Sequence, residues 1–428
     1  MMVSLTGSGC QSVHVLRRYG ITWSVLAPQQ RTIISDMSYD FSEVNSTMQK
    51  YVDREILAGV STAVLAGREL VHLHCSGWAD RENGIALRED HLFRVFSNTK
   101  LVTSIAILLL MEDGRLGLDD PVEDYLPQLG RRRVLRQGAT SLDDTEPARS
   151  SITIRQLLNH TSGLSYGLLD HGSLMYKAYN ERKVLNAFQT LAEMMDVLEE
   201  LPLSFHPGEA WEYSIASDVL ARVVEVVSGR NFEQFIRLRI FNPLGMDDTG
   251  FYVSERDLGR LTAYYGGSDP ANVLQRGLRR LDKSPYPGAF TMPVVRLSGG
   301  GGLVSSLHDM LALMRSLMPD GDTIMQPGTI HLMMQNHLPH GMGIRFPGVG
   351  DVPGKGFGLG GAVTLQASSI DPPGSEGEFE WGGIAGTHWW ISPSHNIAGI
   401  LMTQRLMSFW HPFSFDFKRQ AYAALGIR

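Results

Sequence analysis

Ser97 and Lys100 stand one helical turn apart and form the strongest candidate for chemistry in this sequence. Residues i and i+3 share a helix face, so the serine hydroxyl and the lysine amine can come within hydrogen-bond reach. A serine becomes a good nucleophile when an adjacent base takes its proton, and a lysine can be that base once its pKa falls from about 10.4 towards about 7 to 8. Burial and the positive end of a helix dipole both lower the pKa of such a lysine. The spacing therefore predicts a serine nucleophile activated by a lysine.

Two further elements are compatible with the same site. Tyr213 precedes a predicted helix, where a phenol can lie in a cleft and pass a proton, although a packing tyrosine is the commoner role. Trp381, Gly382 and Gly383 fall in an apolar run that predicts a strand. Two glycines weaken a strand, and either the close approach of a ligand or a plain bulge accounts for them. The glycine run at 299–302 can likewise indicate either a close approach of the backbone to the site or a bulge at the start of a strand.

A second serine fits a different nucleophile motif. Ser165 lies in Gly-Leu-Ser-Tyr-Gly at 163–167, which matches the nucleophile elbow of the α/β-hydrolases. That motif requires a strand before it and a helix after it, whereas a predicted helix at 154–159 precedes Ser165. We therefore expect Ser165 to be a loop residue. His388 is expected to be structural, and the scattered histidines favour neither a metal site nor a cofactor.

The elements that must position these residues follow from the apolar periodicity of the chain. The helix that carries Ser97 and Lys100 is predicted over 97–112, and its dense apolar run indicates that it is buried. A helix at 44–58 and a hairpin of strands at 61–66 and 69–75 precede it. Further helices are predicted at 154–159, 190–200, 217–228, 232–240 and 413–425, and further strands at 379–384, 387–392 and 397–403.

Strands at both ends of the chain and helices between them predict an α/β (α+β) fold with an inserted helical domain. We expect residues 37–120 and 290–428 to form the α/β domain, residues 121–289 to form the mainly helical domain, and the active site to lie in the cleft between them. Residues 1–36 have no continuous apolar segment and are expected to be an N-terminal extension outside this fold.

Composition disfavours several classes of partner and location. The 428 residues carry a formal charge of −7, which disfavours a nucleic-acid partner. Two cysteines make neither a disulfide framework nor a zinc pattern, and weakly favour a reducing compartment. No apolar run approaches the ~20 residues of a membrane span. These features predict a cytoplasmic protein that acts on a small molecule, and they do not indicate an oligomeric state.

The sequence resembles the serine β-lactamases and penicillin-binding proteins, in their class C-like esterase branch, the family VIII carboxylesterases. The resemblance runs from about residue 41 to the C-terminus. The stretches that carry it are FRVFSNTK at 93–100, DGRLGLDDPVEDYLP at 113–127, ITIRQLLNHTSGLSYG at 152–167, FNPLGMDDTGF at 241–251, SGGGGLVSS at 298–306 and WGGIAGTHWWISP at 381–393. It implies an antiparallel sheet flanked by helices.

The resemblance also implies a role for each candidate residue. Ser97 would be the acylated nucleophile, Lys100 its hydrogen-bonded base, and Tyr213 the group that shares the proton and delivers it to the leaving group. The strand beginning at Trp381 would replace the Lys-Thr-Gly strand of the lactamases. Backbone N–H groups of Ser97 and Ile384 would form the oxyanion hole.

Two departures from the lactamase pattern bear on the substrate. Ile215 stands where lactamases have the asparagine that holds the antibiotic side chain, and Trp381 stands where they have the lysine that pairs with its carboxylate. Both favour neutral, short-chain acyl esters, with weak β-lactam turnover still compatible. The alternatives are an acyltransferase, a β-lactamase or a DD-peptidase on the same machinery, and a non-catalytic binding module of this fold.

Overall fold

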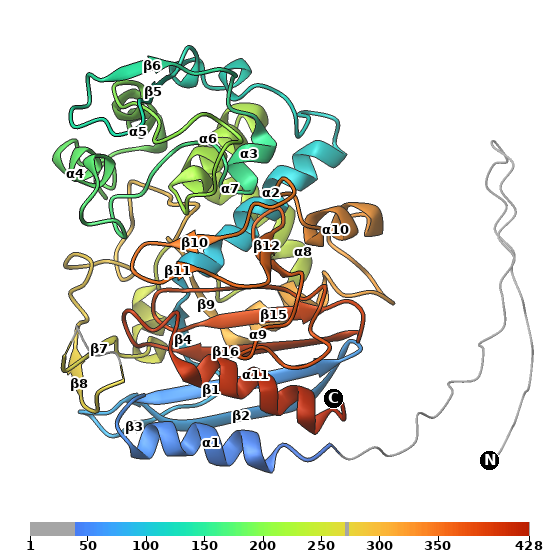
Figure 1. The fold of residues 1–428 in the computed structure, drawn as a ribbon. Helices are drawn as coiled ribbons and strands as arrows, with labels where there is room; N and C mark the ends of the chain where they lie inside the picture. Colours follow the sequence, from blue (N-terminus) through green and yellow to red (C-terminus); the bar gives the residue numbers. More distant parts are fainter. Residues whose placement is uncertain (1–38, 270–273, 428) are drawn as a thin grey trace, which may run out of the picture. The chain divides into compact units, whose positions relative to one another are not determined.

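A computed structural model describes residues 39–269 and 274–427, so the extension predicted at 1–36 lies outside the described residues. An antiparallel sheet of eight strands forms the base of the fold (Figure 1), in the order β12-β13-β14-β15-β16-β1-β2-β3. The strands are β1 (Gly59–Ala66), β2 (Glu69–Asp80), β3 (Ile85–Ala86), β12 (Lys355–Phe357), β13 (Ala362–Thr364), β14 (Phe379–Gly382), β15 (His388–Ser392) and β16 (Ile397–Thr403). The predicted α/β (α+β) class is confirmed.

The sheet joins the two ends of the described chain. Strand β1 pairs with the late strand β16 from Val60 opposite Thr403 to Ala66 opposite Ile397, and pairs with β2 on its other side. Both β1 and β16 are almost entirely buried, which explains why they are near-continuous apolar runs in the sequence.

Alternate residues of these strands enter two different cores. On one face, Val64 and Leu401 pack with residues of α1 (Ser42–Asp53) and α11 (Pro412–Ala424), which lie side by side over the sheet in Figure 1. On the other face, Leu65 and Ile400 join the larger core beneath α2 (Thr99–Glu112) and α9 (Leu307–Arg315).

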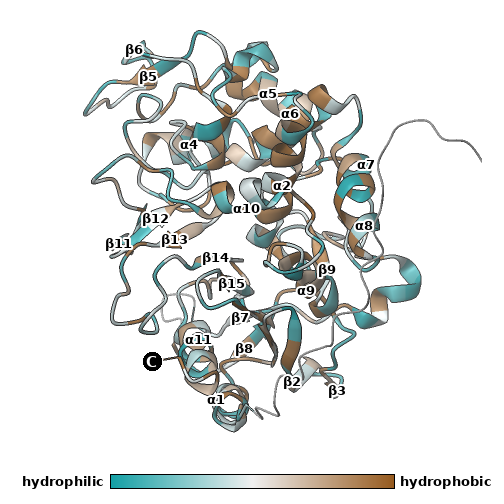
Figure 2. Ribbon diagram, turned by 90° about the vertical axis from the view of Figure 1, so that its right-hand side faces the viewer, coloured by the Kyte–Doolittle hydropathy of each residue, from teal (hydrophilic) through white to brown (hydrophobic). Residues whose placement is uncertain are grey.

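Helix α2 runs through the larger core, and every residue from Thr99 to Leu110 is buried. It packs against α6 (Ala216–Ser228), on which apolar residues, brown in Figure 2, predominate. The remaining helices are α3 (Ile154–Leu158), α4 (Leu174–Glu181), α5 (Leu191–Glu199), α7 (Phe232–Ile236), α8 (Asn242–Leu244) and α10 (Pro327–Met334). Two-stranded ladders complete the fold: β4 (Leu92–Arg94) with β9 (Val304–Ser306), β5 (Arg133–Leu135) with β6 (Thr145–Pro147), β7 (Tyr265–Gly267) with β8 (Leu278–Arg280), and β10 (Arg345–Phe346) with β11 (Gly350–Asp351).

Three predicted helices have different boundaries in the structure. Helix α1 ends at Asp53 instead of residue 58, because Glu55 adopts a left-handed φ of 53° and the chain turns back onto Tyr51. The helix predicted from Ser97 begins as a 3₁₀ turn, Phe96–Asn98, before α2. The one predicted over 232–240 changes from α7 into a π-helical turn at Arg237–Phe241.

The segment after residue 296 is more helical than its strand signals suggest. Helix α9 begins there at Leu307, with the Ser306 side chain accepting a hydrogen bond from the Asp309 N–H as an N-cap. Its buried residues recur at helical spacing: Leu307, Met310, Leu311 and Met314. No helix within 39–269 and 274–427 is long and apolar enough to cross a membrane.

Candidate active site

The turn that carries Ser97 connects a strand to a buried helix. Strand β4 ends at Arg94, two residues before Phe96, whose φ of 43° is unusual for a residue with a side chain. Ser97 follows in the 3₁₀ turn, and α2 begins two residues later. The Ser97 hydroxyl is thereby held at the N-terminal end of a helix, where backbone N–H groups favour negative charge.

Ser97, Lys100 and Tyr213 come together as the sequence predicts. The Tyr213 hydroxyl donates to Ser97 Oγ over 2.7 Å, and Lys100 Nζ lies 3.4 Å from the same oxygen. Lys100 is only 2% exposed, and its Nζ lies 4.6 Å from the centre of the Tyr213 ring. One serine oxygen therefore faces both groups that can exchange its proton.

The glycine run at 299–302 supplies the third partner of Lys100. Lys100 Nζ donates to the Gly300 carbonyl over 2.7 Å, and the pairing of β4 with β9 brings this loop beside the Ser97 turn. A Cβ atom at Gly300 would lie 2.6 Å from the Asp218 carboxylate and 3.4 Å from Lys100 Nζ. A larger residue at this position would have to displace the Asp218 carboxylate, and the Gly300 carbonyl fixes the direction of the lysine amine.

Aromatic rings surround Tyr213. Its ring centre lies 5.4 Å from that of Trp381 and 5.0 Å from that of His160. Burial, together with the Lys100 charge, lowers the pKa of His160, and its Nδ1 lies 3.0 Å from Ser214 Oγ. His160 is therefore a neutral packing group that holds the tyrosine in place.

The residues predicted around Trp381 differ in what they face. Trp381 and Ile384 line the cavity at Ser97, together with the predicted site residues Ser97 and Tyr213. Gly382 and Gly383 instead face protein: a Cβ at Gly382 would lie 2.5 Å from the His388 ring, and one at Gly383 would lie 2.4 Å from Thr387 Oγ1. His388 is itself engaged, with its two ring nitrogens 3.0 Å and 2.9 Å from backbone carbonyl oxygens.

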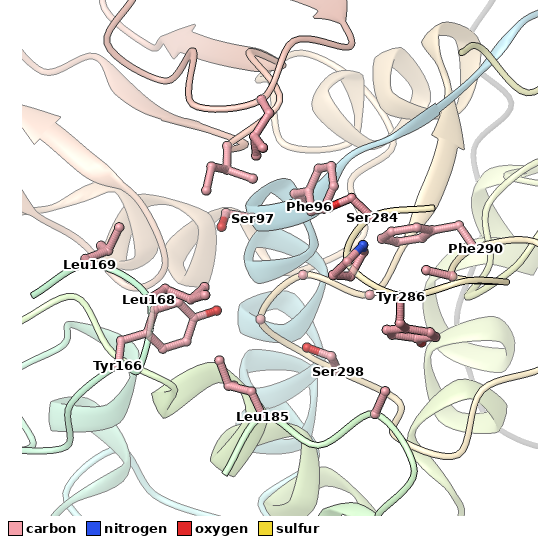
Figure 3. A pocket seen from close by; sticks show the side chains of 18 of the residues that line it. Phe96, Ser97, Tyr166, Leu168, Leu169, Leu185, Ser284, Tyr286, Phe290 and Ser298 are labelled. Atoms are coloured by element: carbon pink, nitrogen blue, oxygen red, sulfur yellow. The ribbon is translucent and has the colours of Figure 1, made fainter. Parts of the chain in front are cut away.

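The cavity in front of Ser97 holds about 630 Å³ and is lined mainly by apolar side chains. Figure 3 shows Ser97 at the end of α2, with Tyr166, Leu168 and Leu185 on one wall and Tyr286 and Phe290 on the other. Its volume and lining are typical of a pocket for a small organic molecule.

The alternative nucleophile Ser165 is placed differently. It is 1% exposed, it does not line the Ser97 cavity, and helix α3 precedes it instead of a strand. Its Oγ donates to Glu212 Oε1 over 2.5 Å, and burial raises the pKa of Glu212 from 4.5 to about 7. Ser165 thus anchors the residue next to Tyr213.

Three features of the site were not expected from the sequence. The Gly300 carbonyl binds Lys100, although the glycine run had only suggested close approach. Asp218 on α6 is fully buried beside this glycine, and among the described residues neither of its carboxylate oxygens has a hydrogen-bond partner. Arg296 lines the cavity. No local pattern marks these residues, because their roles depend on which loops meet in the fold.

Comparison with known proteins is consistent with this arrangement. The β-lactamase family model matches residues 44–414. Esterase EstB from Burkholderia gladioli is 32% identical over 81% of this chain and 86% of its own length, and a lovastatin esterase from Penicillium rubens is 32% identical over 74% and 80%. The solved structure of EstCE1, a hydrolase with promiscuous acyltransferase activity, superposes with a TM-score of 0.75 at 26% identity, covering 89% of this chain and 98% of EstCE1.

Proposed function

Because this chain belongs to the β-lactamase family, we propose that it is a serine carboxylesterase that cleaves short-chain acyl esters through an acyl-enzyme on Ser97. The observation that carries the proposal is the convergence of Tyr213 and Lys100 on Ser97 Oγ, at 2.7 Å and 3.4 Å, beside an apolar cavity. The likeness to EstB and to the lovastatin esterase supports the ester as the bond that is cleaved.

The proposed acylation uses the three side chains in order. Ser97 Oγ attacks the ester carbonyl carbon while its proton moves to the Lys100 amine, which accepts it as the general base. The carbon–oxygen bond to the alcohol then breaks, and the departing alkoxide takes the Tyr213 proton, which Lys100 replaces. Backbone N–H groups of Ser97 and Ile384 are proposed to stabilise the oxyanion. Water attacks the acyl-enzyme by the reverse route and releases the acid.

The side chains of Trp381 and Ile215 support esters over β-lactams. Trp381 is 4% exposed and presents a ring where lactamases present a lysine, and Ile215 is fully buried. Neither residue supplies the polar contacts that a β-lactam antibiotic requires. We propose that β-lactam hydrolysis is at most a weak side activity.

Acyl transfer is the second candidate, since EstCE1 is described as having that activity. The same acyl-enzyme would react with an alcohol in place of water. Adding increasing concentrations of a primary alcohol to an ester reaction separates the two: a transferase forms the new ester in preference to the free acid.

Substitution of the two candidate serines tests the proposal. We expect Ser97→Ala to lower the hydrolysis of p-nitrophenyl butyrate by roughly 10⁴-fold or more, because no other group can form the acyl-enzyme. Ser165→Ala, a matched loss of a buried hydroxyl, is expected to retain most of the activity. Mass spectrometry after a brief reaction should find the butyryl group on the Ser97 peptide, and nitrocefin should acylate the same serine more slowly.

Retention of esterase activity by Ser97→Ala, or phosphonate labelling of Ser165, would overturn the proposal. Failure of the wild-type protein to hydrolyse or bind covalently to either compound would favour the non-catalytic binding module instead.

A further inference from the structure

Arg296 is a cation inside an otherwise apolar cavity. It lies in the loop that leads to the glycine run, and its side chain lines the same space as Ser97. Its Nε and Nη1 atoms are buried, and in the described part of the chain neither has a hydrogen-bond partner. No carboxylate among the described residues lies within 4 Å of its guanidinium. A charged group in such surroundings is unfavourable unless something pairs with it.

Two buried arginines of the fold use their terminal nitrogens differently, although the Nε of each also lacks a partner among the described residues. Arg132 donates to the backbone carbonyls of Leu198 and Glu199, and Arg94 donates to that of Thr262 over 2.8 Å. Their guanidinium groups are used to hold loops together. Among the described residues, the hydrogen bonds of Arg296 are made by its backbone: its N–H donates to the Ala187 carbonyl, and its carbonyl accepts from the Ser298 N–H. Of its side-chain nitrogens, Nη2 is the one that is not enclosed by protein, and among the described residues it has no hydrogen-bond partner, so it remains available to a molecule in the cavity.

Asp218 is a second charged group that acts on Tyr166, and among the described residues it makes no hydrogen bond to the Arg296 donors. Both charges act on Tyr166. Burial and the Asp218 carboxylate raise the pKa of its hydroxyl, and the Arg296 guanidinium lowers it. Asp218 does not line the cavity, and its carboxylate is packed behind Gly300. A ligand in the cavity therefore meets the guanidinium, while the carboxylate stays behind the wall.

A guanidinium keeps its positive charge at all ordinary pH values, and a carboxylate is a common organic anion that can accept a charge-assisted hydrogen bond from Nη2. The apolar remainder of the cavity suits an aliphatic or aromatic linker. We propose that Arg296 makes the enzyme selective for esters that carry a free carboxylate remote from the scissile bond. This inference rests on the proposed esterase function and identifies its substrate class.

The proposal refines the expectation drawn from Trp381. Trp381 stands where the lactamases have a lysine, but Arg296, at another position of the chain, supplies a cation to the lining of the same cavity.

Two matched pairs of substrates test the proposal. One pair places the charge on the acyl side, with mono-p-nitrophenyl adipate against p-nitrophenyl hexanoate. The other places it on the alcohol side, with 4-carboxyphenyl butyrate against phenyl butyrate. The measured quantity is the ratio of kcat/KM for the charged ester to that for the neutral ester. We expect Arg296→Met to lower this ratio by roughly 10- to 100-fold in at least one pair, as loss of a charge-assisted hydrogen-bond pair implies.

Two further variants control the measurement. Arg296→Lys keeps the charge but not the planar fork, and should keep an intermediate ratio. Arg256→Met removes the same charge from a side chain that is 87% exposed, and should leave the ratio unchanged. Urea denaturation of each variant shows whether it is folded.

An unchanged ratio in both pairs, with the neutral ester still hydrolysed, would overturn the carboxylate proposal and leave the esterase proposal intact. An equal loss on charged and neutral esters would also overturn it, and would assign Arg296 to holding the loop. If no ester of either pair were hydrolysed by the wild-type protein, the proposed function itself would fail.

Discussion

Two groups of buried charged side chains adjoin strand β14, and they are partnered very differently. Behind the strand, Lys418 donates to Glu378 and Glu380 at 2.6 Å, and Lys355 donates to Asp371 and Glu380 at 2.8 Å and 2.5 Å. On the cavity side, Lys100 has only a hydroxyl and a backbone carbonyl, while Asp218 has no hydrogen-bond partner among the described residues.

The difference separates charges that are paired within the fold from charges at the site that keep unused hydrogen-bonding capacity. Burial lowers the pKa of Lys418, but the carboxylates of Glu378, Glu380 and Asp371 together raise it above its usual value. The network behind β14 therefore keeps the charge of Lys418 and satisfies it internally. At the site, polar groups keep unused hydrogen-bonding capacity, which is what substrate binding and proton transfer require.

The largest effect that tests this division is catalytic. Lys100→Met should lower kcat/KM for p-nitrophenyl butyrate by roughly 10³- to 10⁴-fold, because it removes the proposed base of Ser97. Its urea midpoint should stay close to that of the wild type, since the lysine makes no ion pair within 4 Å among the described residues. A variant that retained a tenth of the activity would break the comparison.

The next effect is expected in stability. Lys418→Met should lower the free energy of unfolding by about 3 to 5 kcal/mol, because it leaves buried carboxylates short of a counter-charge. Urea denaturation measures this loss, and kcat/KM of the folded fraction should change little. The exposed Arg256→Met is the matched control, with an expected change below about 1 kcal/mol. A change as small in Lys418→Met would mean that the network is not structural.

The smallest expected effect is a pH dependence of stability caused by Glu212, a buried carboxyl next to Tyr213. Burial raises the pKa of Glu212 from 4.5 to about 7, so the folded protein binds a proton there that the unfolded chain has already lost. Its contribution to stability is therefore fully present below about pH 4.5 and is lost as the pH rises through about 7. We expect Glu212→Gln to flatten the fall in stability over this window, as measured by urea denaturation at a series of pH values. Because the two proteins share all other titrating groups, the difference between their pH profiles reports Glu212 alone. An equal change in the free energy of unfolding between pH 5 and pH 7.5 in the wild type and in Glu212→Gln would contradict this prediction.

Local signals were sufficient for most of the elements around the site. The hairpin of β1 and β2, the buried helix α2 and the strands β14 to β16 follow from apolar runs bounded by turn residues, and their presence is confirmed. Strands β12 and β13 were not predicted, because each has three residues within a glycine-rich segment. Strands this short become stable only once their neighbours in the sheet are in place.

The candidate site shows the same limit. Ser97 and Lys100 share one helical turn, so their proximity can be predicted from spacing alone. Spacing alone could not assign Tyr213 to the site, because more than a hundred residues separate it from Ser97 in the sequence. Its assignment depended on the resemblance to the β-lactamase family. Asp218 and Arg296 carry no motif. The packing of α6 against the loop before β9 brings Asp218 beside Gly300, and the same loop brings Arg296 to the cavity.

The pairing of β1 with β16 has a consequence for how the molecule is made. Strand β1 emerges early in synthesis, yet one of its two neighbours consists of residues 397–403. Lys100 likewise donates to the carbonyl of Gly300, which lies two hundred residues later in the sequence. Contacts of such long sequence separation form late and make folding slow. A nascent chain therefore has no assembled nucleophile until almost all of the sequence is made, and truncation before β16 should leave β1 with an unpaired, aggregation-prone edge.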